Sequence, residues 1–277
     1  MNVDTLLVKA ARKLIDMQVI PDWENELLSK APPVLWFGNS QSAKPKILTV
    51  GANPSRWEFL DQKLCEALFK PYQKQYYETK YLSKNRFYHL AENQSYENIL
   101  QSEQLRERII FSFDHYFETN PYNWFGNNKN YSYNVEGLLR GMKASYFDNP
   151  TDFHSEYQAC HIDIFPFATI SDFKSIQEIT ERDILCSNWA KEIVDGLIEY
   201  FKPEKILVFG RTNFNYFSKY FEIDKISTEK NTCFIWNKMY NKHHFIGISA
   251  NLGNPRGFNA QDLFDLGKVL NNLPKFN

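Results

Sequence analysis

The stretch that decides the fold runs from Cys186 to Gly210 and reads CSNWAKEIVDGLIEYFKPEKILVFG. Its first part has an apolar helix face over about residues 186–201, made of Trp189, Ile193, Val194, Leu197 and Ile198. Pro203 ends this helix, and the apolar strand Ile206–Phe209 follows at once. A helix joined by a short loop to such a strand is one αβ unit of a largely parallel, helix-covered sheet. The stretch therefore predicts an α/β fold.

The same reading extends along the chain. Further apolar strands are expected at Ile47–Gly51, Cys160–Phe165 and Phe245–Ser249, with another near a sheet edge at Cys233–Trp236. An amphipathic helix with Asp4 as its N-cap is expected at the start, on the apolar residues Leu6, Leu7, Ala10, Ala11, Leu14 and Ile15. We predict one domain over residues 1–277, with an N-terminal helical extension (about 1–40) and an aromatic, Asn-rich insertion (about 65–160).

Composition narrows the function classes. The 277 residues carry 32 Lys+Arg against 33 Asp+Glu. This balance argues against a protein that coats nucleic acid without sequence specificity, but it allows a local basic strip on the surface. No apolar run approaches the ~18 residues that a bilayer needs, and no secretory signal opens the chain, so we expect no membrane partner and a cytoplasmic location. The 16% aromatic content is expected to be mostly core.

Metal ligation is not expected. The four cysteines form no CxxC pair and are expected to be reduced thiols: Cys65, Cys160, Cys186 and Cys233. His243 and His244 are neighbours on a predicted strand and point to opposite faces, so they cannot chelate one ion together.

Polar turns follow four of the predicted strands. They are Gly51–Ser55, Asp163–Pro166, Gly210–Asn213 and Ala250–Gly257. Ligands of open parallel sheets bind beyond the carboxyl ends of the strands. Three of these turns carry a short polar side chain beside Pro or Gly, which sets a tight turn and brings backbone N–H groups close to a ligand. We therefore expect the functional site among them.

At these turns the sequence resembles the uracil-DNA glycosylase superfamily. GANPS at residues 51–55 is similar to the first motif, written GQDPY or GxNPG, and IDIFPF at 162–167 is similar to the central strand motif. GISAN at 247–251 with NPRGF at 254–258 is similar to the last motif, and NRFY at 85–88 to an NRFW stretch of the mismatch-specific branch. The motifs occur in family order. The resemblance implies a three-layer αβα fold with a central, mostly parallel sheet, and a cofactor-free DNA glycosylase.

The resemblance also implies catalytic roles for two asparagines. Asn53 takes the place of the water-positioning Asp or Asn. Its neutral amide can only orient the water, so the reaction would depend on stabilising the leaving base and on strain in the flipped nucleotide. Asn251 takes the place of the last-motif His and would donate to the base O2 more weakly than His does.

Base recognition is expected to depart from that of uracil. Asp163 stands where uracil-removing members have Asn, and a carboxylate accepts from an exocyclic amine, as acidic residues do with cytosine N4. Ser55 stands where a bulky Tyr would exclude 5-substituents, so a 5-modified cytosine of phage DNA, hydroxymethylated or glucosylated, is the expected base. We assign Ala52 and Trp57 to the base pocket as well. The aromatic residues that could stack on the base are Trp57, Phe59, Tyr122 and Trp124.

DNA is the expected partner of a monomeric protein. Arg256 would fill the gap left by the flipped base or bind phosphate, with Leu252 or Pro255 as an apolar wedge and Asn254 in the same loop. Arg56 and Arg211, each just past a strand end, are candidate phosphate contacts.

The expected activity is monofunctional hydrolysis that leaves an abasic site, because no Lys in the motifs could form a Schiff base. Excision of modified phage bases would serve antiviral defence. Three alternatives stay open. The chain could be a uracil or mismatch glycosylase of base excision repair that tolerates Asp163, or a catalytically inactive member that binds nucleic acid or a nucleotide. The motifs could also be chance turns of an unrelated α/β enzyme.

Overall fold

The computed structural model describes residues 2–60, 86–119, 121–126, 134–171, 176, 178, 188–221, 227–230, 233–240, 242–249 and 258–275. The chain forms two compact units. The helical unit comprises residues 1–37, 52–119 and 163–200, and the sheet unit comprises residues 38–51, 120–162 and 201–277. Residues of the predicted insertion (65–160) thus occur in both units. The predicted single domain with its extension and insertion stays a prediction.

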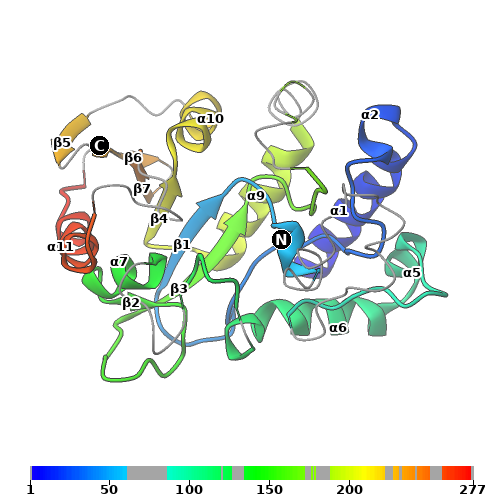
Figure 1. The fold of residues 1–277 in the computed structure, drawn as a ribbon, viewed down its shortest axis with the longest axis horizontal. Coiled ribbons are helices and arrows are strands. Elements are labelled where there is room, and N and C mark those ends of the chain that lie inside the picture. The colour runs from blue at the N-terminus through cyan, green and yellow to red at the C-terminus, as the bar shows by residue number, and fades with distance from the viewer. Residues whose placement is uncertain are drawn as a thin grey trace, which may run out of the picture. The chain divides into compact units, whose positions relative to one another are not determined.

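In the sheet unit, seven strands of the described chain form one mixed sheet in the order β2-β3-β1-β4-β7-β6-β5 (Figure 1). Their bounds are β1 Lys46–Gly51, β2 Ala144–Ser145, β3 Tyr157–Asp163, β4 Lys205–Phe209, β5 Ser227–Lys230, β6 Cys233–Tyr240 and β7 His243–Ile248. The pairs β2–β3, β1–β4 and β4–β7 are parallel, whereas β7–β6 and β6–β5 are antiparallel. The predicted α/β fold with a mostly parallel sheet is confirmed.

The five predicted strands are present, with shifted ends. Strand β3 begins at Tyr157 and ends at Asp163, so the expected strand to Phe165 runs too far. Strand β6 extends to Tyr240 and lies next to the edge strand β5. Strands β2 and β5 were not expected from the sequence, since neither has an apolar run of strand length.

Among the residues that the structure describes, three helices lie in the sheet unit: α7 (Val135–Gly141), α10 (Arg211–Phe221) and α11 (Ala260–Asn271). Helices α7 and α11 pack so closely that a Cβ atom on Gly267 would lie 2.1 Å from the carbonyl oxygen of Leu138. Helix α10 packs on β4 and β7, where Phe214 fills the space above Gly247 and stacks on Trp236 with 4.5 Å between ring centroids.

The helical unit contains α1 (Val3–Gln18), α2 (Pro21–Glu24), η1 (Arg56–Glu58), α5 (Tyr96–Gln101), α6 (Glu103–Asp114), η2 (Tyr116–Glu118) and most of α9 (Asn188–Phe201). The expected apolar face of α1 is buried except at Ile15. The expected cap is wrong: Asn2 caps the helix by accepting from the Asp4 backbone N–H. Asp4 lies in the first turn instead, where it forms an ion pair with Arg106 of α6.

The core of the helical unit is largely aromatic. Phe87 stacks on Tyr116 with ring centroids 4.8 Å apart, and Phe37 meets both rings edge-on. Trp36 packs edge-on against Phe113 and donates its indole N–H to Asp114. These rings are almost fully buried, so they belong to the core, as the sequence predicts for most of the aromatic residues. Within the described ranges, no helix is long and apolar enough to cross a membrane.

Candidate functional site

The turns that follow β1 and β3 are bonded to each other. The backbone N–H of Phe165 donates to the Ala52 carbonyl at 2.9 Å. The chain after Phe165 is held in turn by residues 26–34, through bonds such as Val34 N–H to the Pro166 carbonyl at 2.8 Å. Two of the four predicted motif turns therefore lie together, with Asn53, Ser55 and Asp163 in the helical unit.

The orientation of the Asn53 amide is set by three acceptors. Its Nδ2 donates to Thr169 Oγ1 at 3.0 Å and lies 3.2 Å from the Pro54 carbonyl and 3.5 Å from the Phe167 carbonyl. The Thr169 hydroxyl donates its hydrogen bond to the Ser171 carbonyl at 2.8 Å, so it can only accept a hydrogen bond from Asn53. All three neighbours therefore act as acceptors, and the amide group that faces them must be the N–H donor, Nδ2. The Oδ1 atom consequently accepts no bond from the described residues and can receive one from a water molecule.

Asp163 is buried at the end of β3, with 4% of its surface exposed. A carboxylate in such a place strongly favours a hydrogen-bond donor or a cation beside it. This suits the predicted role of reading an exocyclic amine, which stays a prediction.

Ser55 caps η1 by accepting from the Trp57 backbone N–H at 3.3 Å. The cap explains locally why η1 starts here. Ala52, assigned from the sequence to the base pocket, accepts the Phe165 bond described above through its carbonyl.

Trp57 and Arg56 form a stacked pair. The Arg56 guanidinium lies 4.8 Å from the centroid of the Trp57 ring, and it donates to the Ile170 carbonyl. Trp57 is 9% exposed, and Phe59, a second candidate for stacking on the base, is buried against Phe87. In this conformation Arg56 holds residue 170 in place, and its predicted phosphate contact would require it to leave that position.

Sequence reasoning missed Glu58, which is 2% exposed at the end of η1. Its Oε2 accepts from the Tyr116 hydroxyl at 2.6 Å and lies 3.8 Å from Nη1 of Arg86, which also donates to the Trp57 carbonyl. Burial raises the pKa of Glu58 from its ordinary 4.5 to about 7; Arg86 and Tyr116 act to lower this pKa, and the charge of Asp163 raises it. The available signal was a charged residue inside the apolar run Trp57–Leu60.

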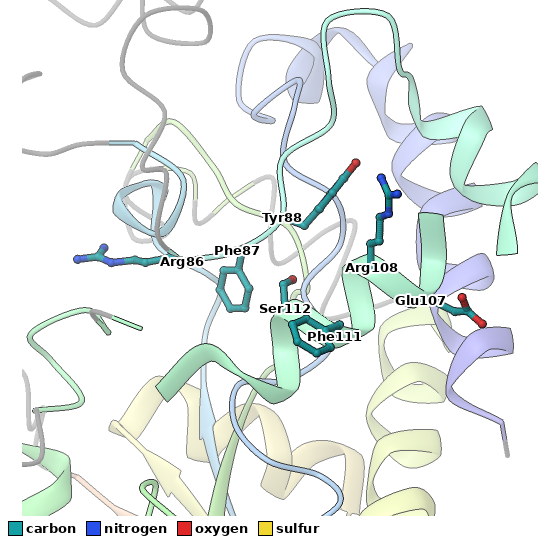
Figure 2. Close-up of a pocket in the computed structure, with 7 residues that line it drawn as sticks. All are labelled: Arg86, Phe87, Tyr88, Glu107, Arg108, Phe111 and Ser112. Atoms are coloured by element: carbon teal, nitrogen blue, oxygen red, sulfur yellow. The ribbon is translucent and has the colours of Figure 1, made fainter. Parts of the chain in front are cut away.

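Arg86 connects this buried group to a surface cavity of about 530 Å³. The cavity is lined by Arg86, Phe87, Tyr88, Glu107, Arg108, Phe111 and Ser112. Figure 2 shows the Tyr88 and Arg108 side chains both extending towards the top of the view, while the Arg86 side chain points to the left. Arg86 to Tyr88 belong to the NRFY stretch, whose Asn85 lies outside the described residues.

The remaining predicted residues are either in the sheet unit or not described. Arg211 is exposed at the first position of α10, directly after Gly210, and Trp124 packs edge-on against His161 and Phe209. Tyr122 is half-buried in the same unit. The last-motif residues lie outside the described part of the chain: Asn251, Leu252, Asn254, Pro255 and Arg256.

Among the described residues, no three His, Cys, Asp or Glu side chains are grouped as a metal ion would need. The Cys160 thiol is buried and reduced, and it donates to the Asn39 carbonyl at 3.5 Å. Fold and turns together define an α/β protein in which polar turns follow β1 and β3. No protein-family model, no curated protein and no solved structure matches the chain.

Proposed function

We propose that this protein is a monofunctional DNA glycosylase with the three-layer fold of the uracil-DNA glycosylase superfamily, and that it excises a 5-modified cytosine from phage DNA. The observation that carries the proposal is the Asn53 amide, whose Nδ2 is held by Thr169 and two carbonyls so that Oδ1 remains for a water molecule. The bonded turns supply the second element, a buried Asp163 that can accept from a base amine.

The chemistry follows from these groups. The bond between the sugar C1′ and the base nitrogen breaks, its electron pair leaves with the base, and the sugar passes through an oxocarbenium-like state. The water held by Asn53 then attacks C1′. Because an amide is not a base at neutral pH, the proton that this water loses passes through solvent to the departing base, which thereby becomes neutral. The products are a free base and an abasic site.

Selectivity would come from Asp163 and Ser55. The Asp163 carboxylate accepts from the N4 amine of cytosine, whereas uracil presents a carbonyl oxygen at that place. The side chain of Ser55 is small, which would leave room beside the 5-position of the base. Unmodified cytosine must be rejected, so contacts with the modification itself would complete recognition.

Excision from four duplexes tests the proposal. They contain uracil, cytosine, hydroxymethylcytosine or glucosylated hydroxymethylcytosine, and abasic sites are cleaved afterwards and counted. Release from a modified cytosine alone supports the proposal, and release from uracil alone overturns the role given to Asp163. No release from any duplex would favour a nucleic-acid-binding protein without glycosylase activity.

Variants locate the activity. Asn53→Ala and Asp163→Ala should abolish excision while circular dichroism shows an unchanged fold. Asn39→Ala is the matched control, because the Asn39 amide bonds Asp148 in the sheet unit. Activity that survives both site variants would show that the site is elsewhere.

A further inference from the structure

One side of helix α6 carries a cation, an exposed aromatic ring and an imidazole. Arg108, Phe111 and His115 are spaced i, i+3 and i+7, so they lie along the same side of the helix, with His115 as its C-cap. Phe111 is 61% exposed, and no other Phe or Trp among the described residues is exposed. A single exposed ring is ordinary on a protein surface, but this ring is held in place beside a cavity.

His115 fixes the orientation of the Phe111 ring. The imidazole stacks on the ring with 3.7 Å between the centroids and 19° between the planes. Its Nδ1 lies 2.9 Å from the Phe111 carbonyl, which can only accept, so Nδ1 carries the proton and this bond anchors the imidazole. Since His115 covers one side of the ring, a flat ligand can stack on the other side, and a preordered ring makes such binding cheaper in entropy.

The cavity of about 530 Å³ opens beside this ring (Figure 2). Its volume lies within the range of roughly 300–1,000 Å³ that is usual for sites of small organic groups. Tyr88 lines the cavity as well, and its hydroxyl donates to Gln94 Oε1 at 3.2 Å, which fixes this second ring. The cavity therefore offers ordered aromatic surface to a planar group.

Arg108 supplies the available positive charge. It is exposed, and it forms no ion pair or hydrogen bond with the residues that the structure describes. Arg86 also lines the cavity, but its guanidinium donates to the Trp57 carbonyl and lies 3.8 Å from the Glu58 carboxylate. A ligand that stacks in the cavity thus meets the Arg108 guanidinium, which favours a ligand with a negative charge beside its planar group.

We propose that this cavity binds single-stranded nucleic acid, with one base stacked on Phe111 and a neighbouring phosphate at Arg108. Every unpaired base has a face that can stack on an aromatic ring, and arginine binds the phosphate beside it. In a duplex both faces of a base are covered by the neighbouring base pairs, so only an unpaired strand can use the ring. The inference goes beyond the proposed base excision, because it concerns binding at a different cavity.

A protein partner would fit this surface less well. Stable protein interfaces bury roughly 1,200–2,000 Å² around an apolar centre. Among the described residues, the exposed large apolar side chains are Phe111 and Val19, and Val19 lies at the end of another helix, α1. One ring beside one guanidinium matches the repeat of a nucleotide chain better than it matches the apolar centre of such an interface.

The experiment measures binding of fluorescein-labelled oligonucleotides by anisotropy. One probe is a twelve-nucleotide thymidine strand, and the other is an abasic strand with the same number of phosphates. Because the two strands differ only in their bases, the wild type should bind the thymidine strand about tenfold more tightly. Phe111→Ala should weaken binding of the thymidine strand about tenfold and leave the abasic strand unchanged.

Two further substitutions at position 111 separate stacking from apolar contact. Phe111→Trp keeps a ring and should retain the affinity for the thymidine strand, whereas Phe111→Leu is apolar without a ring and should lose about as much as Phe111→Ala. Val19→Ala is the matched control, because it shortens the other exposed apolar side chain and should change neither affinity. Circular dichroism checks that each variant keeps its fold.

The salt dependence of binding tests the phosphate contact. Arg108→Gln should weaken both strands alike and reduce the slope of log K against log salt concentration by about 0.7, as expected for one phosphate contact with a single strand. Phe111→Ala should leave the slope unchanged. Arg12→Gln is the control, since Arg12 is an exposed arginine of α1 in the same unit, and its slope should equal that of the wild type.

Several outcomes would overturn the inference. They are equal affinity of the wild type for the two strands, unchanged binding in Phe111→Ala, and the same loss of slope in Arg12→Gln as in Arg108→Gln. Sedimentation that shows a dimer dissociated by Phe111→Ala, without binding of either strand, would assign the ring to self-association instead. None of these measurements requires base release, so they remain decisive even if the proposed excision fails.

Discussion

The close contact between α7 and α11 predicts that replacing Gly267 by alanine lowers the stability of the protein, although this substitution usually stabilises a helix. Alanine in place of glycine inside a helix normally stabilises it by about 1 kcal/mol. A Cβ atom on Gly267 would lie 2.1 Å from the Leu138 carbonyl oxygen and 2.9 Å from the Gly141 Cα, and both obstacles are backbone atoms. Because neither can turn aside, the two helices must separate.

The magnitude follows from that separation. Overpacking of a tight contact costs roughly 1–3 kcal/mol, and here the obstacle is a backbone carbonyl rather than a flexible side chain, which places the cost at the upper end. After the gain in helix propensity, Gly267→Ala should lose about 2 kcal/mol of unfolding free energy. For a protein of this size the Tm should fall by about 4–8 °C.

Thermal and urea unfolding followed by circular dichroism measure this effect. Gln261→Ala is the matched control, since Gln261 is exposed on the same helix and its side chain bonds Asp265 one turn away; its change should stay within about 0.5 kcal/mol. Gly141→Ala meets the Phe264 carbonyl at 2.0 Å and should behave like Gly267→Ala. A Gly267→Ala protein as stable as the wild type would refute the packing argument.

Three further predictions concern other buried contacts. Gly247→Ala would place a Cβ atom 1.9 Å from the Phe214 ring, so unfolding should require about 1–3 kcal/mol less, measured by urea denaturation; unchanged stability would show that the ring can move aside. Glu58→Gln should remove part of the pH dependence of stability. Between pH 4.5 and 7 the folded protein keeps a proton on Glu58 that the unfolded chain releases, so the unfolding free energy of the wild type falls by about 3 kcal/mol as pH rises through this window. If the variant showed the same slope of unfolding free energy against pH, this reasoning would be contradicted. Thr169→Val removes the acceptor that holds the Asn53 amide, so excision should slow by about tenfold with little loss of Tm, and an unaffected rate would show that this bond does not position the amide.

Local patterns predicted the elements that bury a continuous apolar run. The run Lys205–Phe209 is fully buried in β4, and the helix before it is present as α9. Strand β2 has two residues and β5 carries Thr, Glu and Lys, so their strand conformation depends on partners elsewhere in the chain. The Asn2 cap was not predicted either. Asn2 and Asp4 are both good capping residues, and which of them caps α1 depends on where the first turn of the helix begins.

The sequence by itself determined the α/β class, the main strands and the polar turns after them, because these follow from apolar periodicity and from Pro and Gly within a few residues. Only the tertiary structure decided what those turns can do. The orientation of the Asn53 amide depends on Thr169, 116 residues away. The pKa of Glu58 depends on burial first, and then on Arg86, Tyr116 and Asp163 from separate segments. Burial and charge act through space, so residues distant in sequence set the surroundings of side chains whose positions in the turns local sequence predicts.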